Sequence, residues 1–194
     1  MDEIVVGLTD YLLTLACVFF AWMLGTINGG WPEIRRFFVL FFAFTALASL
    51  TGGTYHLLAS DSSSLQALIL WKATVVALGA VALSAWSIGA CLFFSESNRA
   101  RVVIAASIEF LIYSIYVVAI NDQFRVAIAN YTPAAVFLGL SFAFSYRRYP
   151  QPPVLIGLIG LVVTAIAAAI QRLGFSLHPV YFNHNATYHL VQAT

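Results

Sequence analysis

The stretch QALILWKATVVALGAVALSAWSIGACLFFS, residues 66–95, decides the fold class. Its only charged residue is Lys72, and nearly all the others are apolar or small. The hydrocarbon core of a bilayer is about 30 Å thick, and a helix needs roughly 20 apolar residues to cross it. We therefore predict that this stretch forms a transmembrane helix.

The composition of the whole chain supports the same class. Of the 194 residues, 61% are hydrophobic and 9% are charged, whereas soluble domains have roughly 25% charged residues. The mean hydropathy is +0.90. The net charge of +1, without any long basic run, excludes a nucleic-acid-binding protein. We expect an integral membrane protein whose partners are membrane lipids, with no nucleic acid among them.

Apolar runs of membrane-crossing length also lie on both sides of residues 66–95. The breaks between them are rich in the Gly, Pro, Ser and Asn residues that end helices. The predicted spans are residues 5–27, 37–60, 66–95, 101–120, 124–146 and 153–173, with a seventh segment that opens near residue 183. We therefore predict an all-α fold, a seven-transmembrane-helix bundle that forms a single domain over residues 1–194. The seventh helix is expected to be short or truncated at Thr194.

The arginines predict the orientation of the bundle. The loops after the first, third and fifth spans contain Arg35, Arg36, Arg99, Arg101, Arg147 and Arg148. The loops at the other side contain Arg125 and Arg172 beside Asp61 and Asp122. By the positive-inside rule, the first set of loops is cytoplasmic. The N-terminus is then expected outside, so that the second span runs outward and the seventh runs inward.

Several polar side chains are expected in one layer near the outer surface. His56 lies close to the outer end of the second span, and His184 and His189 lie at the start of the seventh segment. Asp10 and Lys72 lie within the first and third spans, a few residues below the same surface. Ionisable residues inside a membrane are costly, and they are usually paired or functional. We expect Asp10 and Lys72 to neutralise each other, either as a structural ion pair or as part of a catalytic site.

The histidines in this layer suggest a metal site. Neutral imidazoles that converge in an apolar bundle suit a divalent ion, most often zinc, with one coordination position open for water. Such an ion lowers the pKa of its water to about 7 and polarises a carbonyl group, as amide or ester hydrolysis requires. On a regular helix, His184 and His189 diverge by about 140°, whereas Asn185 and His189 share a face. We predict His56, His184 and His189 as the ligands, with His184 joining from an unwound helix start. The alternative is that the histidines form hydrogen bonds to neighbouring helices.

Two motifs carry a resemblance to a known family. These are LTGGTYH at residues 50–56 and FNHNATYHLVQ at residues 182–192. A histidine at the end of a second span, with a histidine motif opening a seventh, resembles the superfamily of alkaline ceramidases and progestin and adiponectin receptors. The chain is similar to bacterial ceramidase-like membrane proteins. The resemblance implies a zinc hydrolase of lipid amides in a bacterial inner membrane. It departs from the superfamily at Gly52, where a serine is usual, and in a third span that lacks a carboxylate.

Two functional hypotheses follow. The first is a ceramidase-like intramembrane hydrolase of a lipid amide or ester, in which the three histidines bind zinc and Asp10 and Lys72 are catalytic. The second is a non-enzymatic membrane subunit or receptor that uses the polar layer for packing or ligand binding and has membrane protein subunits as partners. Glu109, in the fourth span, is expected to pair across helices or to face a wet crevice.

Overall fold

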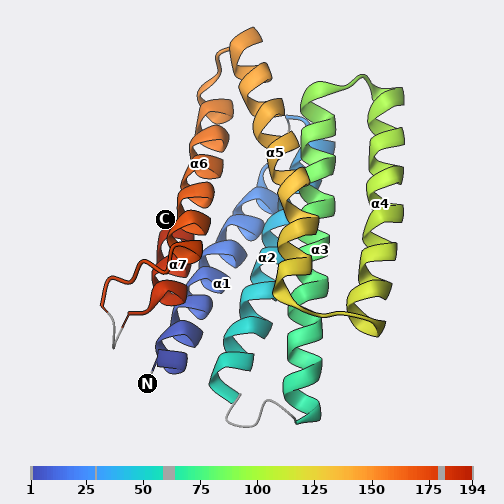
Figure 1. The fold of residues 1–194 in the computed structure, drawn as a ribbon. Helices are drawn as coiled ribbons and strands as arrows, with labels where there is room; N and C mark the ends of the chain where they lie inside the picture. Colours follow the sequence, from blue (N-terminus) through green and yellow to red (C-terminus); the bar gives the residue numbers. More distant parts are fainter. Residues whose placement is uncertain (1, 29, 59–63, 179–181, 194) are drawn as a thin grey trace.

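The computed structural model describes residues 2–28, 30–58, 64–178 and 182–193. Within these ranges the chain folds into a bundle of α-helices that run largely alongside one another (Figure 1). The helices are α1 (Asp2–Thr26), α2 (Pro32–Leu58), α3 (Leu65–Phe93), α4 (Glu96–Ala119), α5 (Phe124–Arg148), α6 (Pro152–Arg172) and α7 (His184–Gln192). The first six are long and apolar enough to cross a membrane, and α7 is short. The predicted all-α bundle is confirmed, and the chain is an integral membrane protein.

Two helices begin earlier than the apolar runs indicate. α2 begins at Pro32 rather than near residue 37, and α4 begins at Glu96 rather than near residue 101. Proline suits the first turn of a helix because its φ angle is already helical and its missing N–H would have no partner there. Ser95 precedes α4 in the extended conformation of an N-cap residue. Both helices therefore start before the chain becomes apolar, among charged side chains suited to a membrane surface.

The loop between α2 and α3 is only partly described. The predicted end of the second span at residues 59–60, together with Asp61, lies outside the described residues. The start of α3 is well defined, because the side chain of Ser64 accepts a hydrogen bond of 3.2 Å from the backbone N–H of Ala67. This cap satisfies one of the N–H groups that every helix start leaves unpaired.

α3 is the central helix of the bundle. It is the most buried of the six candidate spans, and it packs against α2, α4 and α5. Its buried residues are mostly alanine, serine and glycine, with Val75 and Ile88 fully buried among them. Small side chains let neighbouring helices approach closely inside a membrane. The other helices are therefore arranged around α3, with α4 on one side and α6 and α7 on the other (Figure 1).

α7 lies beside the first part of α1, although the two helices are at opposite ends of the sequence (Figure 1). The chain leaves α6 through Gly174, whose φ of 69° is a left-handed conformation that glycine adopts without strain. Asn183 then caps α7 by accepting a hydrogen bond of 3.0 Å from the backbone N–H of Ala186. These two local signals turn the chain back, so that α7 packs against α6 and α1.

Candidate functional site

Glycines bring α1 and α2 close together beside the candidate site. A Cβ atom added at Gly53 would lie 2.8 Å from the Cβ of Asp10 and 3.0 Å from the backbone oxygen of Gly7. One added at Gly52 would lie 3.8 Å from both Asp10 Oδ2 and the hydroxyl oxygen of Thr74. Because these positions lack side chains, the carboxylate of Asp10 has room in the interior, between α2 and α3.

Asp10 meets a histidine of α7 there. The Nδ1 atom of His189 lies 3.2 Å from Asp10 Oδ1, and the side chains are 13% and 6% exposed. The same Nδ1 atom is buried without a partner in hydrogen-bonding geometry. The contact is therefore short enough for an ion pair but is not a hydrogen bond.

The environment of His189 keeps its ring neutral. Burial lowers the pKa of His189 to about 4, and the charge of His56 lowers it further, against a hydrogen bond to the backbone of Val6 that raises it. In one of the two tautomers of the neutral ring, Nδ1 carries the lone pair. A lone pair and a carboxylate oxygen repel each other unless a proton or a cation lies between them.

His56 forms a second contact with a carboxylate of α1. Its Nδ1 atom lies 2.5 Å from Glu3 Oε2, near the start of α1, where the side chains are 22% and 64% exposed. Glu3 and Asp10 are two helical turns apart, so they lie on one face of α1 but about 10 Å apart along its axis. Each of the two histidines therefore contacts a different carboxylate of α1.

The predicted pair between Asp10 and Lys72 is wrong. The amine of Lys72 donates a hydrogen bond to the backbone oxygen of Val118 in α4. Thr74 faces α2, because its hydroxyl is 2.8 Å from that of Thr51. Residues two positions apart on a helix point about 200° apart. Lys72 is consequently turned away from Asp10, toward α4.

The remaining polar residues of α7 have other environments. His184 is half-buried at the first position of the helix. The side-chain oxygen of Asn185 accepts a hydrogen bond of 3.0 Å from Gln171 in α6. In the ranges that the structure describes, no group of three or more His, Cys, Asp or Glu side chains is arranged to hold a metal ion. The centre formed by His56, His184 and His189 therefore stays a prediction.

The contact between Asp10 and His189 does fit two ligands of one cation. Zinc binds histidine nitrogen and carboxylate oxygen at about 2.0–2.2 Å, which places two ligand atoms about 3.4 Å apart at a tetrahedral angle. The observed separation is 3.2 Å. A buried nitrogen lone pair and a carboxylate oxygen are also the donor types that zinc accepts. The donor pair therefore suits a divalent ion, with further ligands still to be supplied.

Sequence reasoning missed Tyr188, which lies next to His189 in the chain. Burial raises the pKa of Tyr188 above its ordinary value, with further contributions from Tyr131 and Asp10, and a hydrogen bond to Gln192 opposes them. The phenol therefore stays protonated as a hydrogen-bonding group close to Asp10. The motif FNHNATYHLVQ at residues 182–192 contains this tyrosine, but sequence reasoning predicts only its histidines as site residues.

A family model matches residues 5–194, which include Asp10, all of α7 and every helix between them. The chain belongs to DUF6962, a family of unknown function. No curated protein and no solved structure matches the chain. Membership in DUF6962 covers the whole bundle and assigns no activity to it, so the ceramidase resemblance enters only as part of a proposal.

Proposed function

We propose that the chain is an intramembrane hydrolase of a lipid amide or ester that depends on a divalent metal, in the first instance zinc. The proposal is carried by one observation, the buried Nδ1 of His189 that faces Asp10 Oδ1 at 3.2 Å without a hydrogen bond. Ionisable residues inside a membrane are usually functional, and this pair has the donor types of a metal site. The ceramidase-like resemblance of the motifs around His56 and His189 agrees with this chemistry.

Asp10 and His189 would hold the ion, with His56 and His184 as the proposed further ligands. When bound, zinc supplies an activated water and polarises a carbonyl group. The residues around the pair keep bulk water away, and a low local dielectric strengthens every electrostatic interaction at the site. Lys72 has no part in this arrangement, because its amine is bonded on the α4 side.

The position of the pair suits a lipid substrate. Asp10 is eight residues after Asp2, which begins α1, so it lies roughly 12 Å below the start of that helix. The amide and ester bonds of membrane lipids lie between the head groups and the hydrocarbon core, which begins roughly 5–7 Å below the membrane surface. Large apolar side chains of α1, including Leu8 and Leu12, are exposed on the surface beside this level. A lipid in a bacterial inner membrane could therefore approach the site from the bilayer.

Metal analysis of the purified protein tests this proposal. We expect about one zinc ion per chain, lost in His189→Ala and reduced in His56→Ala and His184→Ala. His178→Ala is the matched control, because His178 is exposed outside the helices and is not a proposed ligand. A purified protein without stoichiometric metal, or one whose metal survives His189→Ala, would rule the metal site out.

A second candidate function is a non-enzymatic membrane subunit or receptor. It is favoured by the two carboxylate and histidine contacts, which join α1 to α2 and to α7 and so serve to hold the bundle together. In that case Asp10→Asn and His189→Ala would lower stability, and no metal or hydrolysis would be found in the intact protein. A stable membrane protein partner on purification would then identify the role.

A further inference from the structure

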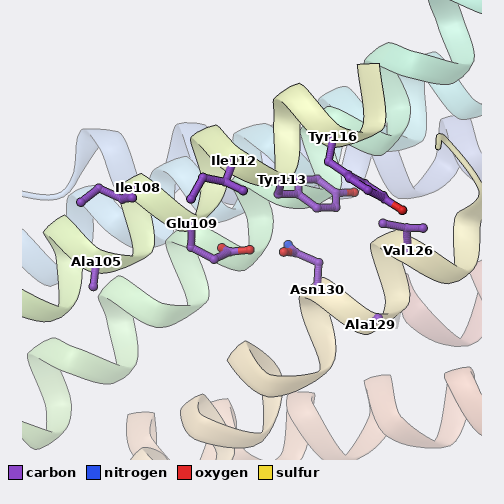
Figure 2. Close-up of a pocket in the computed structure, with 9 residues that line it drawn as sticks. All are labelled: Ala105, Ile108, Glu109, Ile112, Tyr113, Tyr116, Val126, Ala129 and Asn130. Atoms are coloured by element: carbon purple, nitrogen blue, oxygen red, sulfur yellow. The ribbon is translucent and has the colours of Figure 1, made fainter. Parts of the chain in front are cut away.

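A groove separates α4 and α5 on the side of the bundle away from α7. The two helices are joined by the short turn at residues 120–123, but each packs mainly against α3 rather than against the other. The groove between them has a volume of ≈ 480 Å³. Its walls are mostly apolar and are formed by Ala105, Ile108, Glu109, Ile112, Tyr113, Tyr116, Val126, Ala129 and Asn130 (Figure 2).

Two polar side chains face each other across this groove. Figure 2 shows the carboxylate of Glu109 in α4 directed toward the amide of Asn130 in α5. Glu109 Oε2 and Asn130 Nδ2 are both buried, and neither has a hydrogen-bond partner among the described residues. The hydroxyl of Tyr113 is not their hydrogen-bond partner, because it donates a hydrogen bond of 2.8 Å to the backbone oxygen of Val75.

This pair lies at the depth of the hydrocarbon. Glu109 is ten residues before the end of α4 at Ala119, roughly 15 Å along the helix, and Asn130 is six residues after the start of α5 at Phe124, roughly 9 Å. Polar groups left unpaired at such depth are unfavourable, because no bulk water is available to them. Both groups are therefore available to a ligand that forms hydrogen bonds.

We propose that the groove binds a membrane-dissolved amphiphile with an apolar body and a hydroxyl or amide head group. Such a head both donates and accepts hydrogen bonds, so it can donate to Glu109 and accept from Asn130 at once. The aliphatic and aromatic walls suit a hydrocarbon body, and the volume lies in the range of small-molecule sites. The site lies on α4 and α5, apart from the pair formed by Asp10 and His189.

The shape of the groove favours a slender molecule over a partner helix. The turn at residues 120–123 joins α4 to α5 beyond one end of the groove, and the volume of ≈ 480 Å³ suits a small molecule. The side toward the bilayer is open, with Ile108 and Ile112 exposed by 55% and 63% along the rim. An amphiphile can enter there from the surrounding lipid, head first.

Photoaffinity labelling of the purified full chain tests this inference. The probes are a long-chain alcohol with a photoreactive diazirine in its chain, the primary amide of the same chain, and the matched methyl ether, which lacks a donor. We expect the alcohol, the amide or both to label the peptides of α4 and α5 at least about tenfold more than the ether, as the loss of one buried hydrogen bond predicts. Labelling by only one of the two probes identifies the head group.

The double variant Glu109→Leu with Asn130→Leu should lose this labelling. Ser107→Ala and Thr132→Val, which remove exposed hydroxyls bonded within α4 and α5, should keep it. A competition experiment on the unaltered chain does not depend on the folding of variants, and there an unlabelled alcohol should displace the probe while an alkane should not. Equal labelling by alcohol, amide and ether, or labelling that the double variant leaves unchanged, would overturn the proposal. A partner helix cross-linked into the groove in native membranes would also overturn it.

Discussion

At the scale of single residues, the contact between Asp10 and His189 is the feature that needs a chemical explanation. A neutral imidazole that presents a lone pair to a carboxylate at 3.2 Å is unfavourable unless something positive lies between them. A shared proton or a divalent ion satisfies both groups, so the metal site is one of two arrangements that this contact permits, and metal analysis distinguishes them.

The substitution Asp10→Asn keeps the size of the side chain and removes its negative charge. We predict that zinc affinity falls by about 100-fold or more, because a neutral amide oxygen is a much weaker ligand than a carboxylate. Titration of the purified variant against a zinc chelator of known affinity measures this change. Unchanged affinity would show that the carboxylate does not bind the ion.

Glu3 offers a matched comparison on the same face of α1. Its side chain is 64% exposed in its contact with His56, and exposed ion pairs contribute only about 0–1 kcal/mol. We predict that Glu3→Gln lowers the free energy of unfolding by less than about 1 kcal/mol and retains more zinc than His189→Ala, because Glu3 orients His56 and does not bind the ion. Thermal unfolding in detergent and metal analysis test both parts, and complete loss of metal would place Glu3 among the ligands.

At the scale of helices, the close approach of α1 and α2 depends on glycine. Alanine at position 53 would put a carbon 2.8 Å from the Cβ of Asp10 and 3.0 Å from the oxygen of Gly7. We predict that Gly53→Ala destabilises the bundle by about 1–3 kcal/mol, as overpacking does. Gly160→Ala is the control, because nothing lies within 4 Å of its added carbon. Equal unfolding temperatures for the two variants would argue against the tight contact.

The helices show how far sequence reasoning reaches. The apolar runs predicted every helix, because the bilayer sets one required length. They placed the starts of α2 and α4 too late, because both helices begin in the polar membrane surface, ahead of the apolar run. The first residue Pro32 and the N-cap residue Ser95 set these starts. Sequence reasoning placed Asp10 and His189 in one polar layer. It paired Asp10 with Lys72, whereas the structure places Asp10 beside His189. Which face of α3 carries Lys72 depends on how that helix is rotated, and an apolar run does not determine rotation.

At the scale of the whole molecule, the arginines predict that the N-terminus lies outside and that the loop between α3 and α4 is cytoplasmic. Cysteine labelling tests this orientation after Cys17 and Cys91 are replaced by alanine. In intact cells, a membrane-impermeant thiol reagent should label Asn121→Cys in the loop after α4 and should not label Ser97→Cys, which lies near the start of α4. The reverse pattern would invert the topology.

The fold also separates two polar places inside one apolar bundle. Asp10 and His189 lie between α1 and α7, whereas Glu109 and Asn130 lie between α4 and α5, with the central helices between them (Figure 1). The two places share no residue, so changes at one should leave the other intact. A metal site and an amphiphile site on opposite sides of α3 can therefore be tested independently.

Hydrolysis of a long-chain N-acyl amide by the purified protein in lipid nanodiscs tests the central claim most directly. The account predicts release of free fatty acid that stops after zinc is removed, returns when zinc is added back, and is absent in His189→Ala. Fatty acid release that is equal in the unaltered chain and in His189→Ala, or none in a zinc-loaded protein offered both amide and ester lipids, would contradict it.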